Sequence, residues 1–378
     1  MKVGIVGLPN VGKSTLFNCL SQSKAQSENY PFCTIDPNVS IVNVPDLRLD
    51  KLDELISPEK LIPTNVKIVD IAGLVKGASK GEGLGNKFLS NIRETDAIIH
   101  VLRCFDDTNI VHVDGKINPM SDKEVVEYEL ILKDIEVVDK RLDKVKKTLR
   151  SGSNESKKEI EILEKVKLQL ENVSLKKSDY SDEQVEEFIK PLELISFKPI
   201  LYVCNVGEND VLSGNDYVDQ VKKEIENKDC EIIIISAKIE SEINELDSSE
   251  EKKLFLDDLG LEESGSNKLI RASYKLLNLH SYFTAGEKEV RGWTIKIGDS
   301  AYDAAGQIHT DFQKGFICAE VIAYDDYVEL GSESKVKEAG KMRLEGKEYI
   351  VSDGDIMHFR FNLSLIHISE PTRRYAIS

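Results

Sequence analysis

Short apolar runs alternate with glycine-rich or polar breaks along the first 120 residues of the chain. The runs, rich in valine and isoleucine, cover residues 2–7, 40–44, 66–71 and 97–102. Two more follow much later, at residues 199–204 and 231–236. Runs of this length between glycine, proline and aspartate are typical of buried strands in an α/β sheet. The pattern therefore predicts one sheet domain, formed by residues 1–120 and 199–280, which a long insertion interrupts.

The insertion, residues 121–198, has a helical pattern instead. About half of residues 121–190 are charged, with both signs mixed. Ser121 and Glu124 match a capping box at the start of a helix, and residues 151–154 break the pattern. Apolar residues recur at alternating steps of three and four, as in a coiled coil; they are Tyr128, Ile131, Ile135, Val138, Leu142, Val145 and Leu149, then Ile160, Leu163, Val166, Leu170 and Val173. We expect an antiparallel helical hairpin, either a solvated structural element or an arm to which a partner docks.

A third region, residues 281–362, returns to strand patterns at 292–297 and 315–322. Asp353 and Gly354 separate two further apolar runs, 349–351 and 356–359, and this arrangement predicts a hairpin. The region is therefore expected to form a separate small α+β domain. The last residues, 363–378, do not continue the strand pattern and resemble a translated sequencing adapter, so we expect a non-native tail.

Composition narrows the class of protein. Of the 378 residues, 40% are hydrophobic and 31% are charged, which is typical of globular chains that bury a core. The net charge of −17 disfavours binding of nucleic acid or anionic lipid through bulk charge, so any RNA contact needs a local patch. No apolar run is long enough to span a bilayer, and the first strand starts without room for a signal peptide, so we expect a cytoplasmic protein without a membrane partner. The six cysteines lack any C-x-x-C spacing, which favours reduced thiols over disulfides or zinc.

The first strand leads into a phosphate-binding motif. Residues 7–14 read Gly-Leu-Pro-Asn-Val-Gly-Lys-Ser, which matches G-x-x-x-x-G-K-[ST] between a strand and a helix. Such a loop turns its backbone N–H groups toward phosphates, its lysine reaches the outer phosphates, and its serine binds magnesium. A plain glycine turn is the alternative. The residues predicted to bind nucleotide here are Asn10, Val11, Gly12, Lys13, Ser14 and Thr15, with Ser14 also a magnesium ligand.

A second motif follows the strand at residues 66–71. Asp70 and Gly73 form D-x-x-G, in which the aspartate holds magnesium through water and the glycine N–H senses the γ-phosphate. Thr34, in a proline-broken loop between the two motifs, is expected to complete the magnesium shell, unless it is a plain surface threonine. The glycine-rich stretch 77–85 predicts a mobile switch loop, with a passive linker as the alternative.

The base-reading motif departs from the usual pattern. GTPases of this class use N-K-x-D, whose aspartate accepts hydrogen bonds from guanine. The corresponding place here is Asn205, Val206, Gly207 and Glu208, without the lysine and with a longer carboxylate. Guanine donates its N1 proton to this aspartate, whereas adenine has no N1 proton to donate. Loss of the aspartate therefore removes the selection of guanine. A second base-side loop follows the last buried strand, and its residues are Ser236, Ala237 and Lys238.

Taken together, these motifs resemble the Obg-like ATPases of the YchF family, among the translation-factor-related P-loop GTPases. The resemblance covers residues 1 to about 362, including the stretch 70–79, the altered base motif, the inserted helices, and residues 309–316, which are similar to a TGS domain. It implies an α/β P-loop NTPase fold: a Rossmann-like three-layer core, an inserted coiled-coil hairpin and a carboxy-terminal β-grasp (TGS) domain at 281–362. It also implies magnesium-dependent hydrolysis of ATP in preference to GTP, with adenine held by Asn205 and by backbone groups around Val206.

The resemblance further implies a switch linked to ribosomes or to stress, with the ribosome or a ribosomal subunit as partner and RNA contacts through the TGS or helical face. Two alternatives stay open. One is a GTPase or a dual-specificity NTPase. The other is a ribosome-binding protein that nucleotide regulates, with incidental turnover.

Three positions take their meaning from the resemblance. Leu74 stands where many GTPases carry a water-orienting glutamine, so another group must position the attacking water. The family's candidate is a histidine that matches His112, although the sequence alone equally suits a core or loop histidine. Asn10 resembles the asparagine that helps to bind K⁺ near the phosphates in potassium-activated relatives, with loop capping as the alternative.

Overall fold

The computed structural model describes residues 1–22, 38–71, 91–107, 110, 115–148, 154–225 and 230–362. The chain divides into two compact units. Unit 1 contains Met1–Val44 and Asn65–Leu277, and unit 2 contains Pro45–Thr64 and the chain from Asn278 onward. Within the described residues, no helix combines the length and the apolar composition that a membrane crossing needs.

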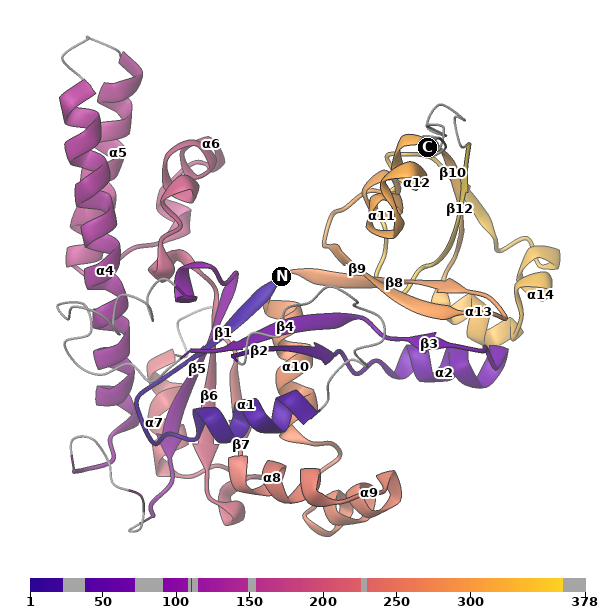
Figure 1. Ribbon diagram of the computed structural model, residues 1–378, viewed down its shortest axis with the longest axis horizontal. Coiled ribbons are helices and arrows are strands. Elements are labelled where there is room, and N and C mark those ends of the chain that lie inside the picture. Colours follow the sequence, from indigo (N-terminus) through magenta and orange to yellow (C-terminus); the bar gives the residue numbers. More distant parts are fainter. Residues whose placement is uncertain are drawn as a thin grey trace, which may run out of the picture. The chain divides into compact units, whose positions relative to one another are not determined.

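Unit 1 is built on a six-stranded sheet in the order β2-β4-β1-β5-β6-β7 (Figure 1). All neighbouring strands are parallel except β2 and β4, which are antiparallel. The strands are β1 (Lys2–Val6), β2 (Val39–Asn43), β4 (Asn65–Asp70), β5 (Ala97–Cys104), β6 (Ile200–Val206) and β7 (Ile232–Ile235). All six were expected from the apolar runs. The β5 residues are buried throughout, as an apolar strand covered on both faces requires.

Helices cover both faces of this sheet. On one face, α7 and the first turns of α4 pack on β5 and β6, where Leu102, Tyr202 and Val218 share a core. On the other face, α10 packs against β6 and β7 and also contacts α1. This three-layer α/β architecture agrees with the predicted fold class. The helices are α1 (Lys13–Gln22), α4 (Pro119–Thr148), α5 (Asn154–Glu171), α6 (Asp182–Gln184), α7 (Asp216–Ile225), α8 (Ala237–Glu245), α9 (Ser249–Asp258) and α10 (Gly265–Leu276), with short 3-10 or π turns at residues 177–179, 185–189, 190–192, 195–197 and 208–210.

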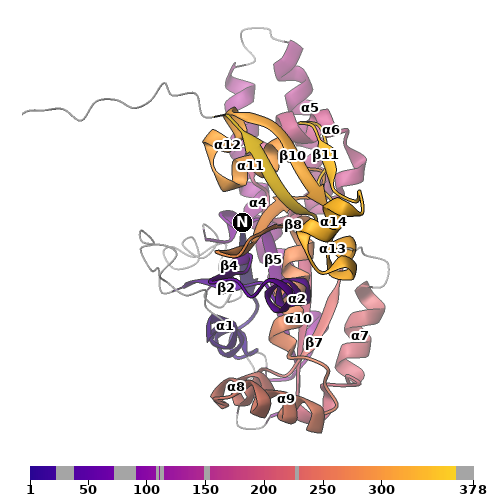
Figure 2. The same cartoon turned by 90° about the vertical axis from the view of Figure 1, so that its right-hand side faces the viewer.

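Helices α4 and α5 lie side by side as a hairpin (Figures 1 and 2). Val138, Leu142, Leu163 and Val166 are buried in their shared core, as the spacing predicts. The two ends of the stripe differ from that prediction, because Tyr128 and Val173 are exposed, and Leu149 lies outside the described residues.

The start of α4 also differs. The helix begins at Pro119, where the Asn118 side chain accepts from Ser121 N at 3.2 Å, so an Asn cap followed by proline replaces the expected Ser121 capping box.

Unit 2 contains a second six-stranded sheet, in the order β11-β10-β12-β8-β9-β3; Figure 2 shows β11 beside β10. Its face toward α11 has a core around Tyr282 and Phe359, and its other face packs against α2 and α13. The strands are β3 (Leu61–Ile62), β8 (Leu279–Ala285), β9 (Val290–Lys296), β10 (Phe316–Ile322), β11 (Arg343–Glu345) and β12 (Ile356–Phe361). The helices are α2 (Leu47–Ile56), α11 (Ala301–Ile308), α12 (Thr310–Lys314), α13 (Tyr324–Leu330) and α14 (Glu333–Glu338).

The predicted assignment of all of residues 1–120 to the nucleotide-binding domain needs a correction, because Pro45–Thr64 belongs to unit 2. Leu49 and Leu52 of α2 are buried against Phe283 of β8, and β3 pairs in parallel with β9. Apolar spacing predicts that a helix buries one face, but it does not say which core receives that face. The inserted segment 121–198 groups with unit 1.

The predicted hairpin at 349–359 is wrong. Ile350 bridges Ser300, while β12 pairs with β10 on one side and β8 on the other. Gly354, with φ +91°, donates its N–H to Ser281 O at 2.7 Å, and the Asp353 carboxylate accepts from Ser281 N. The Asp-Gly turn therefore moves the chain to another part of the sheet instead of reversing it onto its neighbour.

Candidate nucleotide-binding site

The loop between β1 and α1 has the backbone that a phosphate cradle needs. Gly7, Asn10 and Gly12 all have positive φ, at 155°, 63° and 96°. A Cβ on Gly7 would lie 2.5 Å from Val101 O, and one on Gly12 would collide with the Asn205 amide nitrogen. Only glycine fits at these two positions. Leu16 N bonds to Gly12 O at 2.9 Å, which closes the first turn of α1 and leaves the N–H groups at its start facing the loop.

Lys13 lies buried beneath this loop. Its side chain is 6% exposed, and Nζ donates to Leu8 O at 2.5 Å. Burial lowers the pKa of Lys13 to about 8, although the nearby Asp70 carboxylate opposes that shift. Burial also raises the pKa of Asp70, opposed by Lys13 and by a hydrogen bond from Ser14. The sheet brings these residues together, because Ile5 of β1 is in register with Asp70 at the end of β4.

The residues around Asp70 fit a magnesium ion. Its Oδ1 atom is buried and has no hydrogen-bond partner among the described residues, which is a costly state for a carboxylate oxygen. The exposed Ser14 hydroxyl supplies a second hard oxygen ligand. No group of three or more His, Cys, Asp or Glu residues in the described part of the chain could hold a metal alone. A magnesium at Ser14 and Asp70 would therefore take the rest of its shell from water, from phosphate oxygens and from the predicted Thr34, which lies outside the described residues.

Asn205 connects the phosphate loop to the base side of the site. It is 5% exposed; its Nδ2 donates to Val11 O at 2.9 Å, and its Oδ1 accepts from Ala237 N at 2.9 Å. The amide still has one hydrogen and one lone pair to offer to a ligand. Val206 and Ser236 are buried at 3% and 1%, so at these two positions we expect backbone groups to face a base.

Glu208 makes an ion pair that sequence reasoning missed. Its carboxylate bonds to Lys238 Nζ, so the two base-side loops are connected through their side chains. This bond raises the pKa of the Lys238 ammonium. The glutamate that stands in place of the guanine-reading aspartate is thus neutralised by a partner from the other loop. The sequence could have indicated this pair, because each of the two base-side loops carries one charged residue and the two charges are opposite.

Arg103 was also missed. It is 1% exposed and stands in the mostly apolar β5, where a buried cation needs partners. Its guanidinium donates to Phe105 O at 3.2 Å, Asp107 O at 3.1 Å and Ile110 O at 3.0 Å. Arg103 therefore fixes the described part of the loop that leaves β5 toward His112.

Several predicted site residues lie outside the described residues. They are Thr34, Gly73, Leu74 and His112, together with the glycine-rich stretch 77–85. Among the described ones, the structure brings together the phosphate loop, Asp70, Asn205 and the loop 236–238. Thr15 is exposed in the first turn of α1.

We expect the affinity for ATP to fall above pH 8. Phosphate oxygens favour the charged form of Lys13, so its pKa rises on binding from about 8 in the free protein. The affinity for ATP is then at its maximum below pH 8 and falls as the pH rises toward the pKa of Lys13 in the complex. The expected loss of affinity between pH 7 and pH 9 is roughly tenfold. Titration calorimetry with a non-hydrolysable ATP analogue measures this change. Lys13→Arg, which keeps its charge, should have a flat profile; an equally flat profile for the unmodified chain would contradict the prediction.

Comparison with known proteins agrees with this geometry. Residues 2–165 match a family model described as a 50S ribosome-binding GTPase. Residues 279–362 match the carboxy-terminal model of YchF GTPases, described as a protein of unknown function (DUF933).

Individual relatives match over almost the whole chain. The chain is 54% identical to "Ribosome-binding ATPase YchF" of Bacillus subtilis over 365 residues, which cover 96% of this chain and 100% of that protein. It is 52% identical to the protein of the same name in Escherichia coli O157:H7, over 96% of this chain and 99% of that one. The solved structure of the Schizosaccharomyces pombe YchF GTPase superposes with a TM-score of 0.86 at 41% identity, covering 95% of this chain and 97% of that one. Relatives of this identity over at least 95% of the chain show that the chain belongs to the YchF family.

Proposed function

We propose that the chain is a magnesium-dependent ATPase that acts in the cytoplasm as a nucleotide-controlled switch on ribosomes. The observation that carries the proposal is the Glu208–Lys238 pair beside an intact phosphate loop. The phosphate-binding groups suit any nucleoside triphosphate, whereas the longer Glu208 carboxylate, paired with Lys238, stands in place of the aspartate that reads guanine. Relatives named ribosome-binding ATPases support both the reaction and the partner.

The residues of the phosphate loop have separate tasks in this function. Lys13 and the N–H groups of residues 10–15 bind the phosphates and hold the terminal one in place. Ser14 and Asp70 would hold magnesium, which neutralises charge on the phosphates when bound. Asn10, with its left-handed backbone, is the proposed neighbour of a potassium ion. Thr34 and Gly73 are the proposed switch contacts, and Leu74 leaves the positioning of water to another group.

We also infer that residues 281–362 act as a TGS domain. The family-model match to residues 279–362 supports a shared domain but not a ligand. RNA contacts through this domain or through the α4–α5 hairpin remain a prediction, and the net charge of −17 requires them to be local.

Ribosome co-sedimentation with single-turnover kinetics tests the proposal. The ATP-bound and ADP-bound forms should sediment with ribosomes to different extents, and ribosomes should accelerate ATP cleavage. Faster GTP than ATP cleavage would favour a GTPase. Nucleotide-dependent sedimentation with a turnover rate that ribosomes leave unchanged would favour a binding protein with incidental hydrolysis.

Restoring the guanine motif should shift the base preference. Val206→Lys together with Glu208→Asp places a short carboxylate opposite guanine N1–H and releases it from the Lys238 pair. We expect the GTP-to-ATP affinity ratio to rise at least tenfold, as one charge-assisted hydrogen bond allows. Competition binding of the two diphosphates measures the ratio. Glu208→Gln is the matched control and should leave guanine unfavoured; an unchanged ratio in the double variant would mean that backbone contacts or pocket shape dominate.

His112 is proposed to position the attacking water. His112→Ala should lower kcat at least tenfold while the affinity for ATP changes little, because the interaction forms in the transition state. Single-turnover rates and equilibrium binding separate the two effects. The exposed His358 of β12 provides the control, since His358→Ala should change neither. If kcat survives the loss of His112, that residue returns to a structural role.

A further inference from the structure

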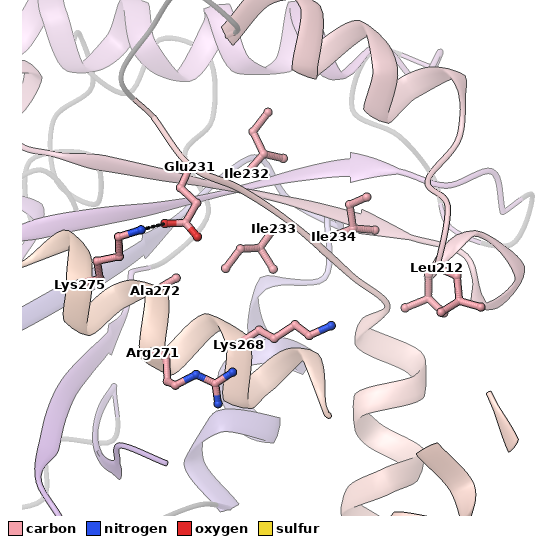
Figure 3. A pocket seen from close by; sticks show the side chains of 10 residues that line it. Leu212, Glu231, Ile232, Ile233, Ile234, Lys268, Arg271, Ala272 and Lys275 are labelled. Carbon is pink, nitrogen blue, oxygen red and sulfur yellow. Dashed lines mark ion pairs between the residues drawn. The ribbon is translucent and has the colours of Figure 1, made fainter. Parts of the chain in front are cut away.

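A groove of about 490 Å³ runs along the outer edge of β7, on the side away from β6 (Figure 3). Its floor is the edge strand itself, including Ile232 and Ile234. The cationic side chains of α10 line one side, and Leu212 lines the other. None of these residues belongs to the phosphate or base contacts described above.

The floor of the groove offers unpaired backbone groups. In the parallel register of β6 and β7, Tyr202 lies opposite Ile232 and Cys204 opposite Ile234, and Tyr202 N bonds to Glu231 O. This pattern directs the N–H and C=O groups of Ile232 and Ile234 away from β6. No other described residue donates to them or accepts from them. They form the open edge to which an extended segment can add as a further strand.

The walls of the groove differ in chemistry. Lys268, Arg271 and Lys275 share one face of α10, and all three side chains are exposed. Arg271 pairs with Glu263, and Lys275 lies 3.8 Å from Glu231. Lys268 forms no ion pair with any described residue. On the opposite wall, Leu212 is 61% exposed.

The cationic wall is held rigidly against the strand. Glu240 of α8, which is 3% exposed, accepts from Gly265 N at 2.7 Å and from Ser266 N at 3.0 Å. These bonds fix the amino-terminal end of α10, where a Cβ on Gly265 would lie 2.9 Å from Ile235 of β7. Lys268 is one turn away, so its backbone is held beside the strand edge, while its exposed side chain can adjust to a ligand.

We propose that this groove binds an extended segment of a partner protein in which acidic and apolar residues alternate, added as a strand to the edge of β7. Successive side chains of a strand point to opposite faces, so acidic residues meet Lys268 and Lys275 while apolar ones meet Leu212. Single-stranded RNA also carries negative charge but has no peptide groups to pair with Ile232 and Ile234. The inference is independent of the proposed nucleotide chemistry.

The test uses a fluorescein-labelled peptide of eight residues in which valine and glutamate alternate, measured by fluorescence anisotropy with the full chain. We expect saturable binding, at least tenfold weaker when glutamine replaces glutamate. Two further peptides carry N-methyl groups on every second backbone nitrogen, one peptide on the odd positions and the other on the even positions. In one of the two, the methyl groups remove the hydrogen bonds to the strand edge, and its affinity should fall at least tenfold.

Variants locate the binding site. The double variant Lys268→Glu, Lys275→Glu should bind the peptide at least tenfold more weakly, while its Tm and its basal rate of ATP cleavage stay unchanged. Lys253→Glu, on the exposed face of α9, is the matched control and should bind normally. Three results would overturn the proposal: no saturable binding at millimolar peptide, a uridine oligonucleotide that binds at Lys268 and Lys275 in its place, or a dimer of this chain that the double variant abolishes.

Discussion

Lys13→Ala should abolish useful ATP binding, with a loss of about 10²-fold or more in affinity. The side chain is the one cation within the phosphate loop, and its bonds to phosphate are charge-assisted. The helix start and the backbone N–H groups remain, but they carry only partial charge. Titration calorimetry with a non-hydrolysable ATP analogue measures the loss directly.

The same substitution should leave the nucleotide-free protein at least as stable. Burial moves the pKa of Lys13 from 10.5 to about 8, so holding the charge at neutral pH costs roughly 3 kcal/mol. That cost already includes the attraction of Asp70, and the loss of the hydrogen bond from Lys13 Nζ to Leu8 O offsets part of the gain. We therefore expect an unchanged or higher Tm without nucleotide, and no increase in Tm when ATP is added. The control is Lys222→Ala, at an exposed position of α7, in which ATP should still raise the Tm. Near-normal affinity for ATP in Lys13→Ala would refute the phosphate-loop assignment.

Asn205→Ala should damage stability and binding together. The substitution leaves Val11 O and Ala237 N buried without their partners, at a cost of about 2 to 4 kcal/mol. Both groups belong to loops that surround the nucleotide, so their relative position is no longer fixed. We expect a clear drop in Tm and at least a tenfold loss of ATP affinity, measured by thermal unfolding and by calorimetry below the new Tm.

Asn215→Ala is the matched control for general destabilisation. Asn215 also bonds to backbone, with Nδ2 to Cys104 O at 2.8 Å and Oδ1 accepting from Tyr217 N at 3.1 Å at the start of α7. It should lower Tm without a comparable loss of affinity. Equal losses of affinity in both variants would mean that Asn205 has no specific role in joining the two loops.

The sheet of unit 1 could be predicted because its signal is local. A strand covered on both faces is mostly apolar, so β1, β5 and β6 are visible as runs rich in valine, isoleucine and leucine. The phosphate loop is equally local, since glycine is required wherever the backbone takes φ values that other residues avoid.

What could not be predicted depends on pairs of residues distant in sequence. The Glu208–Lys238 pair joins two loops. Leu49 is buried in the core of unit 2 against residues more than 200 positions later in the sequence. The Asp353–Gly354 turn shows the same limit. The dipeptide predicted a reversal, but its bonds to Ser281 decided which strand the chain would join.

The assignment of α2 and β3 to unit 2 has a consequence for the order of synthesis. Leu61 of β3 pairs with Val290 of β9, so about 230 residues are made between the two partners. At a synthesis rate of roughly 5 to 20 residues per second, about 10 to 50 seconds pass between the synthesis of α2 and that of the strands against which its apolar face packs. A chain that stops before Asn278 leaves Leu49 and Leu52 without their core partners, so we expect such a nascent fragment to bind chaperones.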